Sequence, residues 1–210
     1  VCNIYIIRNG NIYFRKDVDK IMKNYIKDYN DEYYVFKLAL DQDKHIEYMH
    51  GGFNHIYKDN DTYKLYTYDG YIPLGEDCSK LFELYTNEDV LSIDNTGIVY
   101  EQYRACSNDN AIVCTLQCNS NCVMCPCSEQ SRRNSGLYCL EELRELLRYI
   151  PNTAPFLTVT GGEPTLLKDD FLGLMSILQY NFGKTNFLLL TNGRAFSDYD
   201  FTQRFVKCLP

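Results

Sequence analysis

Four of the ten cysteines in this 210-residue chain lie within residues 118–127, here called the cysteine loop. Cys118, Cys122 and Cys125 are spaced by four and three positions, and Cys127 follows them. Residues 119–121 (Asn-Ser-Asn) are turn formers, so we expect a loop that curls its cysteines around a shared object. Such a tight cluster is more typical of a metal site than of the spread, paired cysteines of a disulfide scaffold.

The type and spacing of these cysteines admit more than one chemistry. Three thiolates can hold three irons of a four-iron cluster and leave the fourth iron open to another ligand. Structural zinc prefers four protein ligands, often as two separated pairs, and a second such pair is absent. Cys127 could supply a fourth thiolate, although only Pro126 separates it from Cys125. The loop alone therefore leaves open an iron–sulfur cluster, a closed four-cysteine site, and inert or disulfide-bonded thiols.

The elements that must hold this loop form a repeating pattern in the second half of the chain. Apolar runs at residues 111–116, 156–160 and 185–190 have the character of short strands. Amphipathic helical patterns separate and follow them. Strands and helices that alternate in this way predict a parallel sheet covered by helices.

Three helices are expected in this half. Their apolar faces are formed, in chain order, by Leu140, Leu143, Leu147 and Ile150; by Phe171, Leu174 and Leu178; and by Phe201, Phe205 and Leu209. Pro151 stops the first helix, and Asp169 or Asp170 can cap the second. Ser197, with Asp200 three residues later, resembles a capping box for the third helix.

The loops that follow these strands carry the polar chemistry. The cysteine loop follows the first strand, residues 161–164 (Gly-Gly-Glu-Pro) follow the second, and residues 191–193 (Thr-Asn-Gly) follow the third. In parallel sheets of this kind, ligands bind at the carboxyl ends of the strands. We therefore expect the three loops to converge on one rim.

The first half of the chain has a different pattern. An Asn9-Gly10 turn between alternating apolar runs predicts a hairpin over residues 2–16, and a helical period follows over residues 18–29. Further strands are expected at residues 33–40, 63–68, 90–93 and 98–103. We therefore predict a small α+β accessory domain, residues 1–108, ahead of a second domain, residues 109–210.

All three histidines, His45, His50 and His55, lie in the first half at even spacings of five residues. This spacing places neighbours on different faces of a helix and on opposite faces of a strand. It therefore disfavours a three-histidine metal site, and we expect surface or hydrogen-bonded histidines.

The composition excludes several classes of function. The net charge of −7 argues against a general nucleic-acid or anionic-membrane binder, because phosphate binding needs clustered Lys and Arg. The sequence contains no apolar run long enough to span a membrane, and residues 1–7 lack the basic start and cleavage site of a secretory leader, so we expect neither feature. We expect a cytoplasmic protein without nucleic-acid or membrane partners.

Two motifs together resemble the radical S-adenosylmethionine (SAM) superfamily. They are Cys118-x3-Cys122-x2-Cys125 after the first strand and Gly161-Gly162-Glu163-Pro164 after the second, and the resemblance spans roughly residues 111–210. It implies an α/β fold, the partial (β/α) barrel of this superfamily, with three of its strand–helix units in this chain. It also implies a [4Fe–4S] cluster bound by Cys118, Cys122 and Cys125, whose open iron binds SAM.

The resemblance also implies roles for residues around the cofactor. Those expected to contact SAM are Met124, Thr160, Gly161, Gly162, Glu163 and Asn192. Gly161 and Gly162 would let the backbone approach the cofactor, and Glu163 offers a carboxylate to its methionyl ammonium. Met124 stands where the superfamily usually has an aromatic residue beside the adenine. Reductive cleavage of SAM would give a 5′-deoxyadenosyl radical that abstracts hydrogen from the substrate.

A finer resemblance is to the radical maturases of the His-Xaa-Ser repeat peptide systems. It is carried by residues 103–110, 122–125, 160–166 and 190–194. Residues 126–129 (Pro-Cys-Ser-Glu) depart from the Ser-Gln-Pro-Pro usual in those maturases. This resemblance implies a peptide substrate and an electron donor. A small-metabolite substrate and a non-catalytic iron–sulfur module are the alternatives, and we expect either a longer chain or a second chain to complete the barrel.

Overall fold

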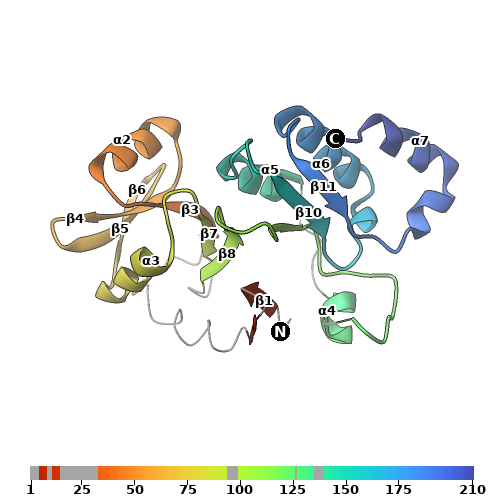
Figure 1. The fold of residues 1–210 in the computed structure, drawn as a ribbon, viewed down its shortest axis with the longest axis horizontal. Coiled ribbons are helices and arrows are strands. Elements are labelled where there is room, and N and C mark those ends of the chain that lie inside the picture. The colour runs from red at the N-terminus through yellow and green to blue at the C-terminus, as the bar shows by residue number, and fades with distance from the viewer. Residues whose placement is uncertain (1–4, 9–10, 15–32, 94–98, 126, 135–139) are drawn as a thin grey trace. The chain divides into compact units, whose positions relative to one another are not determined.

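The computed structural model describes residues 5–8, 11–14, 33–93, 99–125, 127–134 and 140–210 (Figure 1). The chain divides into two compact units, residues 6–106 and residues 107–210 together with 1–5. The helix expected over residues 18–29 and the Asn9-Gly10 turn lie outside the described residues. The strands expected on either side of that turn are present as a two-stranded sheet, β1 (Tyr5–Arg8) and β2 (Asn11–Phe14).

The unit of residues 6–106 is built on a six-stranded sheet with the order β6-β5-β4-β3-β7-β8. The strands are β3 (Tyr34–Ala39), β4 (His55–Asp59), β5 (Thr62–Thr67), β6 (Gly70–Leu74), β7 (Val90–Ile93) and β8 (Val99–Tyr103). Only β3 and β4 pair in parallel, and α2 (Gln42–Gly51) connects them. A parallel pair needs such a crossover, whereas the antiparallel pairs β4–β5 and β5–β6 are joined by tight turns.

The crossover helix α2 was not predicted from the sequence, although its ends carry ordinary capping signals. The Asp41 side chain accepts a hydrogen bond from the Lys44 backbone N–H at 2.8 Å, as an N-cap residue does. Gly52 ends the helix with a φ of 66°, a conformation that favours glycine. The strand β4 that follows was also missed, because its five residues, His-Ile-Tyr-Lys-Asp, contain no apolar run.

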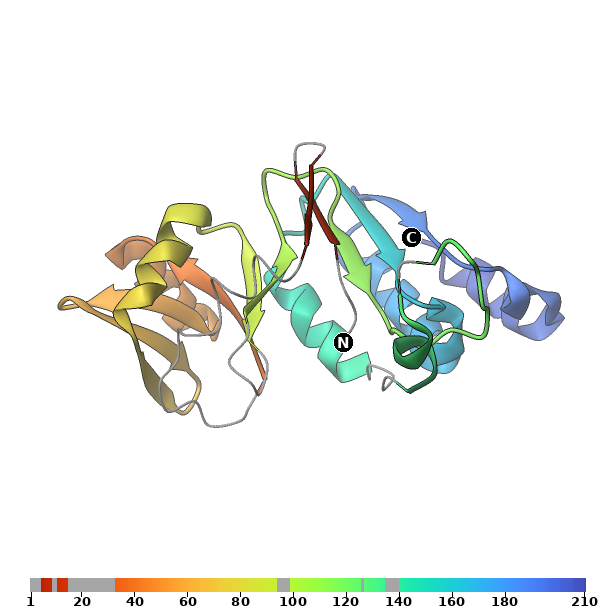
Figure 2. The ribbon, with the colours of Figure 1, turned by 90° about the horizontal axis from the view of Figure 1, so that it is seen from below.

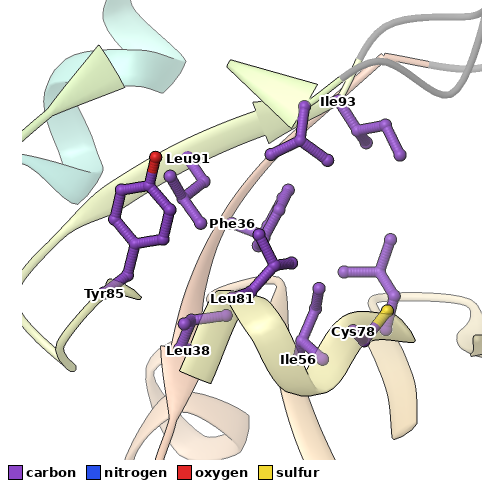
Figure 3. Close-up of a cluster of buried hydrophobic side chains, with 10 residues drawn as sticks. Phe36, Leu38, Ile56, Cys78, Leu81, Tyr85, Leu91 and Ile93 are labelled. Atoms are coloured by element: carbon purple, nitrogen blue, oxygen red, sulfur yellow. The ribbon is translucent and has the colours of Figure 1, made fainter. Parts of the chain in front are cut away.

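One face of this sheet forms an apolar core (Figure 3). Alternate residues of neighbouring strands point to this face, because side chains along a strand alternate between the two faces. The core contains Phe36 and Leu38 of β3, Ile56 of β4, Leu65 of β5, and Leu91 and Ile93 of β7. Leu81 of α3 (Ser79–Leu84) and Cys78 pack against them and close the core.

Two of the three histidines meet in this unit. His55 of β4 is fully buried, and its Nδ1 donates to the carbonyl oxygen of Phe53 at 2.8 Å. Since that leaves Nε2 of the neutral ring as an acceptor, His45 Nδ1 of α2 donates to it at 2.8 Å. His50 is exposed. The expectation of hydrogen-bonded or surface histidines is therefore confirmed.

The unit of residues 107–210 contains a three-stranded parallel sheet with the order β11-β10-β9. Its strands are β9 (Ala111–Val113), β10 (Phe156–Thr160) and β11 (Asn186–Leu189). β10 and β11 are the teal and blue arrows that point the same way in Figure 2. The parallel sheet predicted from the three apolar runs is therefore confirmed, with shorter strands than expected at β9 and β11.

Helices α5 (Leu140–Tyr149) and α6 (Asp169–Asn181) follow β9 and β10 in the chain. Their buried residues are Leu143, Leu146, Leu147 and Tyr149 of α5, and Phe171, Leu172, Leu174, Met175 and Leu178 of α6. Gly173 lets the two helices approach closely, because a Cβ there would lie 2.8 Å from a methyl carbon of Leu140. Pro151 follows the end of α5, as predicted.

Two predicted helix starts are wrong. At α6 the N-cap position is Lys168, which makes no side-chain capping bond, because a 3₁₀ turn (Pro164–Leu167) leads directly into the helix. At α7 (Tyr199–Lys207) the cap is Asp198, whose carboxylate accepts from Phe201 N at 3.1 Å. Ser197 ends the preceding 3₁₀ turn (Arg194–Ser197) and donates to the Arg194 carbonyl instead.

A short helix, α4 (Glu129–Asn134), directly follows the cysteine loop and was not predicted. In the part of the chain that the structure describes, every helix is too short or too polar to cross a membrane.

The histidine pair makes the stability of the unit of residues 6–106 depend on pH. Burial lowers the pKa of His55; the hydrogen bond to Phe53 opposes this shift and the nearby His45 adds to it. Burial also lowers the pKa of His45. Below the ordinary histidine pKa, the unfolded chain therefore binds protons that the folded unit does not. We expect stability to fall as the pH drops from about 7 to 5, by at most about 1.4 kcal/mol per pH unit for each histidine.

Hydrogen exchange of peptides covering β3 and β4, repeated at several pH values, would measure this dependence of stability on pH. His55→Gln should flatten it, and His50→Gln, at the exposed end of α2, should keep it. Equal slopes in wild type and His55→Gln would contradict the assignment.

Candidate functional site

Three loops leave the carboxyl ends of the parallel strands and are joined by hydrogen bonds. The Asn192 side-chain amide donates to Asn119 Oδ1 at 2.7 Å and to Ser120 Oγ at 3.0 Å. Arg194 Nη1 donates to the Asn119 carbonyl at 2.6 Å. The predicted convergence of the loops after β9 and β11 is therefore confirmed, over a separation of more than seventy residues in the sequence.

Glu163 connects the loop after β10 to the same network. Its side chain is fully buried, and its Oε2 accepts from Asn192 N at 2.7 Å. Its Oε1 accepts from Thr191 Oγ1 at 2.7 Å, and from the backbone N–H and hydroxyl of Thr165 at 3.1 and 2.5 Å. One carboxylate thus holds the loops after β10 and β11 together, and Asn192 extends the connection to the cysteine loop.

The charge of Glu163 is stabilised by these donors. Burial alone would raise the pKa of the carboxyl group, but hydrogen bonds from Thr165, Asn192 and Thr191 outweigh it and lower the pKa. A carboxylate has about four lone-pair sites, and three of the four donors share Oε1. Oε2 accepts a single hydrogen bond and therefore keeps the capacity for one more donor.

Gly161 and Gly162 lie against backbone of the same chain. Gly162 N donates to the Thr115 carbonyl at 2.7 Å, and Glu163 N donates to the Gln117 carbonyl at 2.8 Å. A Cβ on Gly161 would clash with the Thr115 carbonyl oxygen, and one on Gly162 with that of Gln117. Gly161 also has a φ of 146°, which only glycine adopts readily. The close approach that these glycines allow is thus to residues 115–117, and an approach of SAM stays a prediction.

The cysteine loop is partly open to solvent. Cys122 is exposed, and Cys118, Cys125 and Cys127 are half-buried. Cys125 N donates to the Cys122 carbonyl at 3.1 Å and closes a turn. Met124 lies at the tip of this turn and is 92% exposed. Among the described residues, no three His, Cys, Asp or Glu side chains lie close enough to hold a metal ion. Cluster binding would therefore require the cysteine loop to close around the cluster.

Arg132 of α4 lies beside the cysteines. Burial alone would raise the pKa of Cys125, but hydrogen bonds from the Arg132 side chain and from Cys127 outweigh it and lower the pKa. Ser120 N also donates to Cys118 Sγ at 3.4 Å. Donors directed at sulfur favour the thiolate, which is the form that binds metal. The donor set therefore fits an iron–sulfur cluster, since thiolates are its usual ligands.

Sequence reasoning missed two features of this rim. Arg132 was not singled out, because the sequence gives no signal that it is buried while the adjacent Arg133 is exposed. Glu163 was assigned to the cofactor alone, because its donors Thr191 and Asn192 lie 28 and 29 residues away. The Thr160 carbonyl, also expected near SAM, accepts from Cys114 N at 2.8 Å and extends the pairing of β9 with β10.

A match to a known protein family covers all three loops of this rim. Residues 112–208 match the sequence model of the Radical SAM superfamily. This span is a radical SAM domain. Neither the curated proteins nor the solved structures gave a match. Members of the superfamily generally cleave SAM to a radical and typically bind a [4Fe–4S] cluster, and all three loops fall inside the radical SAM domain.

We expect Gly162→Ala to lower the free energy of unfolding of the radical SAM domain by about 3 kcal/mol, because its methyl group would be forced into the Gln117 backbone. Gly183→Ala is the matched control, since its Cβ would lie 4.0 Å from the nearest carbonyl oxygen. Urea unfolding followed by circular dichroism measures both. A Gly162→Ala protein as stable as Gly183→Ala would contradict the close backbone approach.

Glu163→Gln keeps the shape of the side chain but directs an amide at groups that donate hydrogen bonds. We expect the free energy of unfolding to fall by about 1.5 to 3 kcal/mol, the usual contribution of hydrogen bonds to a charged group. Glu145→Gln, which removes an exposed ion pair with Arg148, should change stability by less than about 1 kcal/mol. The difference should be full above the ordinary pKa of glutamate and should be lost as the pH falls through the lowered pKa that Glu163 has in the folded state, where the carboxylate becomes protonated.

Proposed function

We propose that this chain is a radical SAM enzyme in which Cys118, Cys122 and Cys125 hold a [4Fe–4S] cluster. The three parallel strands would be the first strand–helix units of the partial barrel of that superfamily. The observation that carries the proposal is the hydrogen-bonded rim, in which Asn192 and Glu163 bring the Thr-Asn-Gly and Gly-Gly-Glu sequences to the cysteine loop. When bound and reduced, the cluster would supply the electron that cleaves SAM to methionine and a 5′-deoxyadenosyl radical.

The residues of the chain have distinct tasks in this proposal. Glu163 Oε2 and the Asn192 side chain would face the amino-acid part of SAM, and Met124 would cover the adenine. Gly161 and Gly162 keep the loop after β10 pressed against residues 115–117, which fixes the distance between the cofactor residues and the cysteines. Holding reactants in fixed geometry is a large part of such catalysis.

We further propose that the substrate is a ribosomally made peptide, as in the His-Xaa-Ser maturases. The support is the similarity of residues 103–110, 122–125, 160–166 and 190–194 to those maturases. The reaction also requires a one-electron donor, which we place, like this protein, in the cytoplasm. A short repeat peptide encoded by a gene next to the gene of this protein would be the first substrate to test.

Anaerobic reconstitution with iron and sulfide, followed by a reductant and SAM, should yield 5′-deoxyadenosine, detected by chromatography. Cys122→Ala should abolish the product at little cost in stability, because Cys122 is exposed. The equally exposed Cys106 provides the control, and Cys106→Ala should retain product. Cys127→Ala should also retain it, which would exclude the closed four-cysteine site. A loaded, folded wild-type protein that makes no product would support a non-catalytic module instead.

A further inference from the structure

Arg132 is a buried arginine whose side chain contacts the cysteine loop on both sides of Cys122 and Cys125. The residue is only 8% exposed, although it lies on a helix of six residues. Its Nη1 donates to the Cys127 carbonyl at 2.7 Å, and its Nη2 donates to Asn121 Oδ1 at 2.5 Å. Asn121 and Cys127 lie on either side of Cys122 and Cys125, so one guanidinium group spans this part of the loop.

The backbone of Arg132 adds two further contacts. Cys118 N donates to the Arg132 carbonyl at 3.0 Å, and Arg132 N donates to the Ser128 carbonyl at 3.1 Å. Arg132 therefore contacts the first of the predicted cluster ligands, and it contacts residues on either side of the other two.

A guanidinium group suits this task better than an ammonium group does. It is planar, presents five N–H donors in a fixed fork and stays charged at all relevant pH values. A lysine would carry the same charge but could not donate in fixed directions to Asn121 and Cys127 together. Hydrogen bonds to the sulfurs of a cluster, and the charge around it, are the main influences of a protein on its reduction potential.

We propose that Arg132 is a positioning residue, which anchors the cysteine loop at Asn121 and Cys127 so that a shorter segment has to close around a cluster, and that its charge inside the loop raises the reduction potential of that cluster. This inference rests on the proposed cluster at Cys118, Cys122 and Cys125. A positive charge next to the cluster favours the reduced state, which carries one more negative charge. The same side chain would thus make the cluster both harder to lose and easier to reduce.

Arg133 provides a matched control on the same helix. Its side chain is 70% exposed and pairs with Glu129 at 2.7 Å, so R133Q removes the same formal charge from the next position without touching the loop contacts of Arg132. R132Q removes both the fork and the charge, whereas R132K removes the fork and keeps the charge. The three variants separate positioning from electrostatics.

The experiment compares reconstituted wild type, R132Q, R132K and R133Q anaerobically. The rate of iron loss to a chelator reports on how firmly the loop holds the cluster. A redox titration followed by electron paramagnetic resonance reports the midpoint potential. We expect R132Q to shift the one-electron reduction equilibrium about tenfold toward the oxidised form, which corresponds to about 59 mV. R132K should keep most of the potential but lose iron several-fold faster than wild type, and R133Q should match wild type in both.

Two results would overturn the proposal. One is an R132Q cluster with the same potential as the R133Q cluster, and the other is an R132K cluster that resists the chelator as long as wild type does. Complete loss of iron from R132Q, with unchanged helix content and normal loading of R133Q, would support it. A wild-type protein that binds no cluster would instead refute the proposed function, so the two failures are distinguishable.

Discussion

A single buried carboxylate governs the geometry of the rim. Glu163 takes hydrogen bonds from Thr165, Thr191 and Asn192, so the loops after two strands share one acceptor group. An unpaired buried charge is costly, which makes these bonds mutually dependent: a donor that moves away leaves the carboxylate short of partners. The glycines before it serve the same end, because they admit the backbone of residues 115–117 into direct contact. The cysteine loop therefore leaves the sheet from a fixed base.

The sequence was sufficient to predict the parallel arrangement of this unit, and the reason is physical. Strands of helix-covered parallel sheets have continuous apolar runs and helices have a period near 3.6, so the two kinds of element are distinct in the sequence. The convergence of the loops then followed from topology alone. Short helices with polar residues carry no such signal, and α2 and α4 were missed for that reason.

Contacts between side chains that are far apart in the sequence could not be predicted from the sequence. The side chain of Glu163 could equally meet a cofactor or a neighbouring loop, and nothing local distinguishes the two. Arg132 and Arg133 are chemically identical in the sequence, yet one is buried among cysteines and the other pairs with Glu129 at the surface. The choice of Asp198 rather than Ser197 as a cap likewise depends on where the preceding 3₁₀ turn ends.

The division of the cysteine loop into anchored and open parts bears on how a cluster would be assembled. Asn119, Ser120 and Asn121 are tied to side chains from elsewhere in the fold, whereas the tip at Met124 is exposed. Fixing one residue of backbone costs about 1 to 2 kcal/mol, and for the anchored residues folding has already met this cost. If the proposed cluster is bound, it can therefore be assembled last, in a finished protein, with only the exposed tip left to close around it.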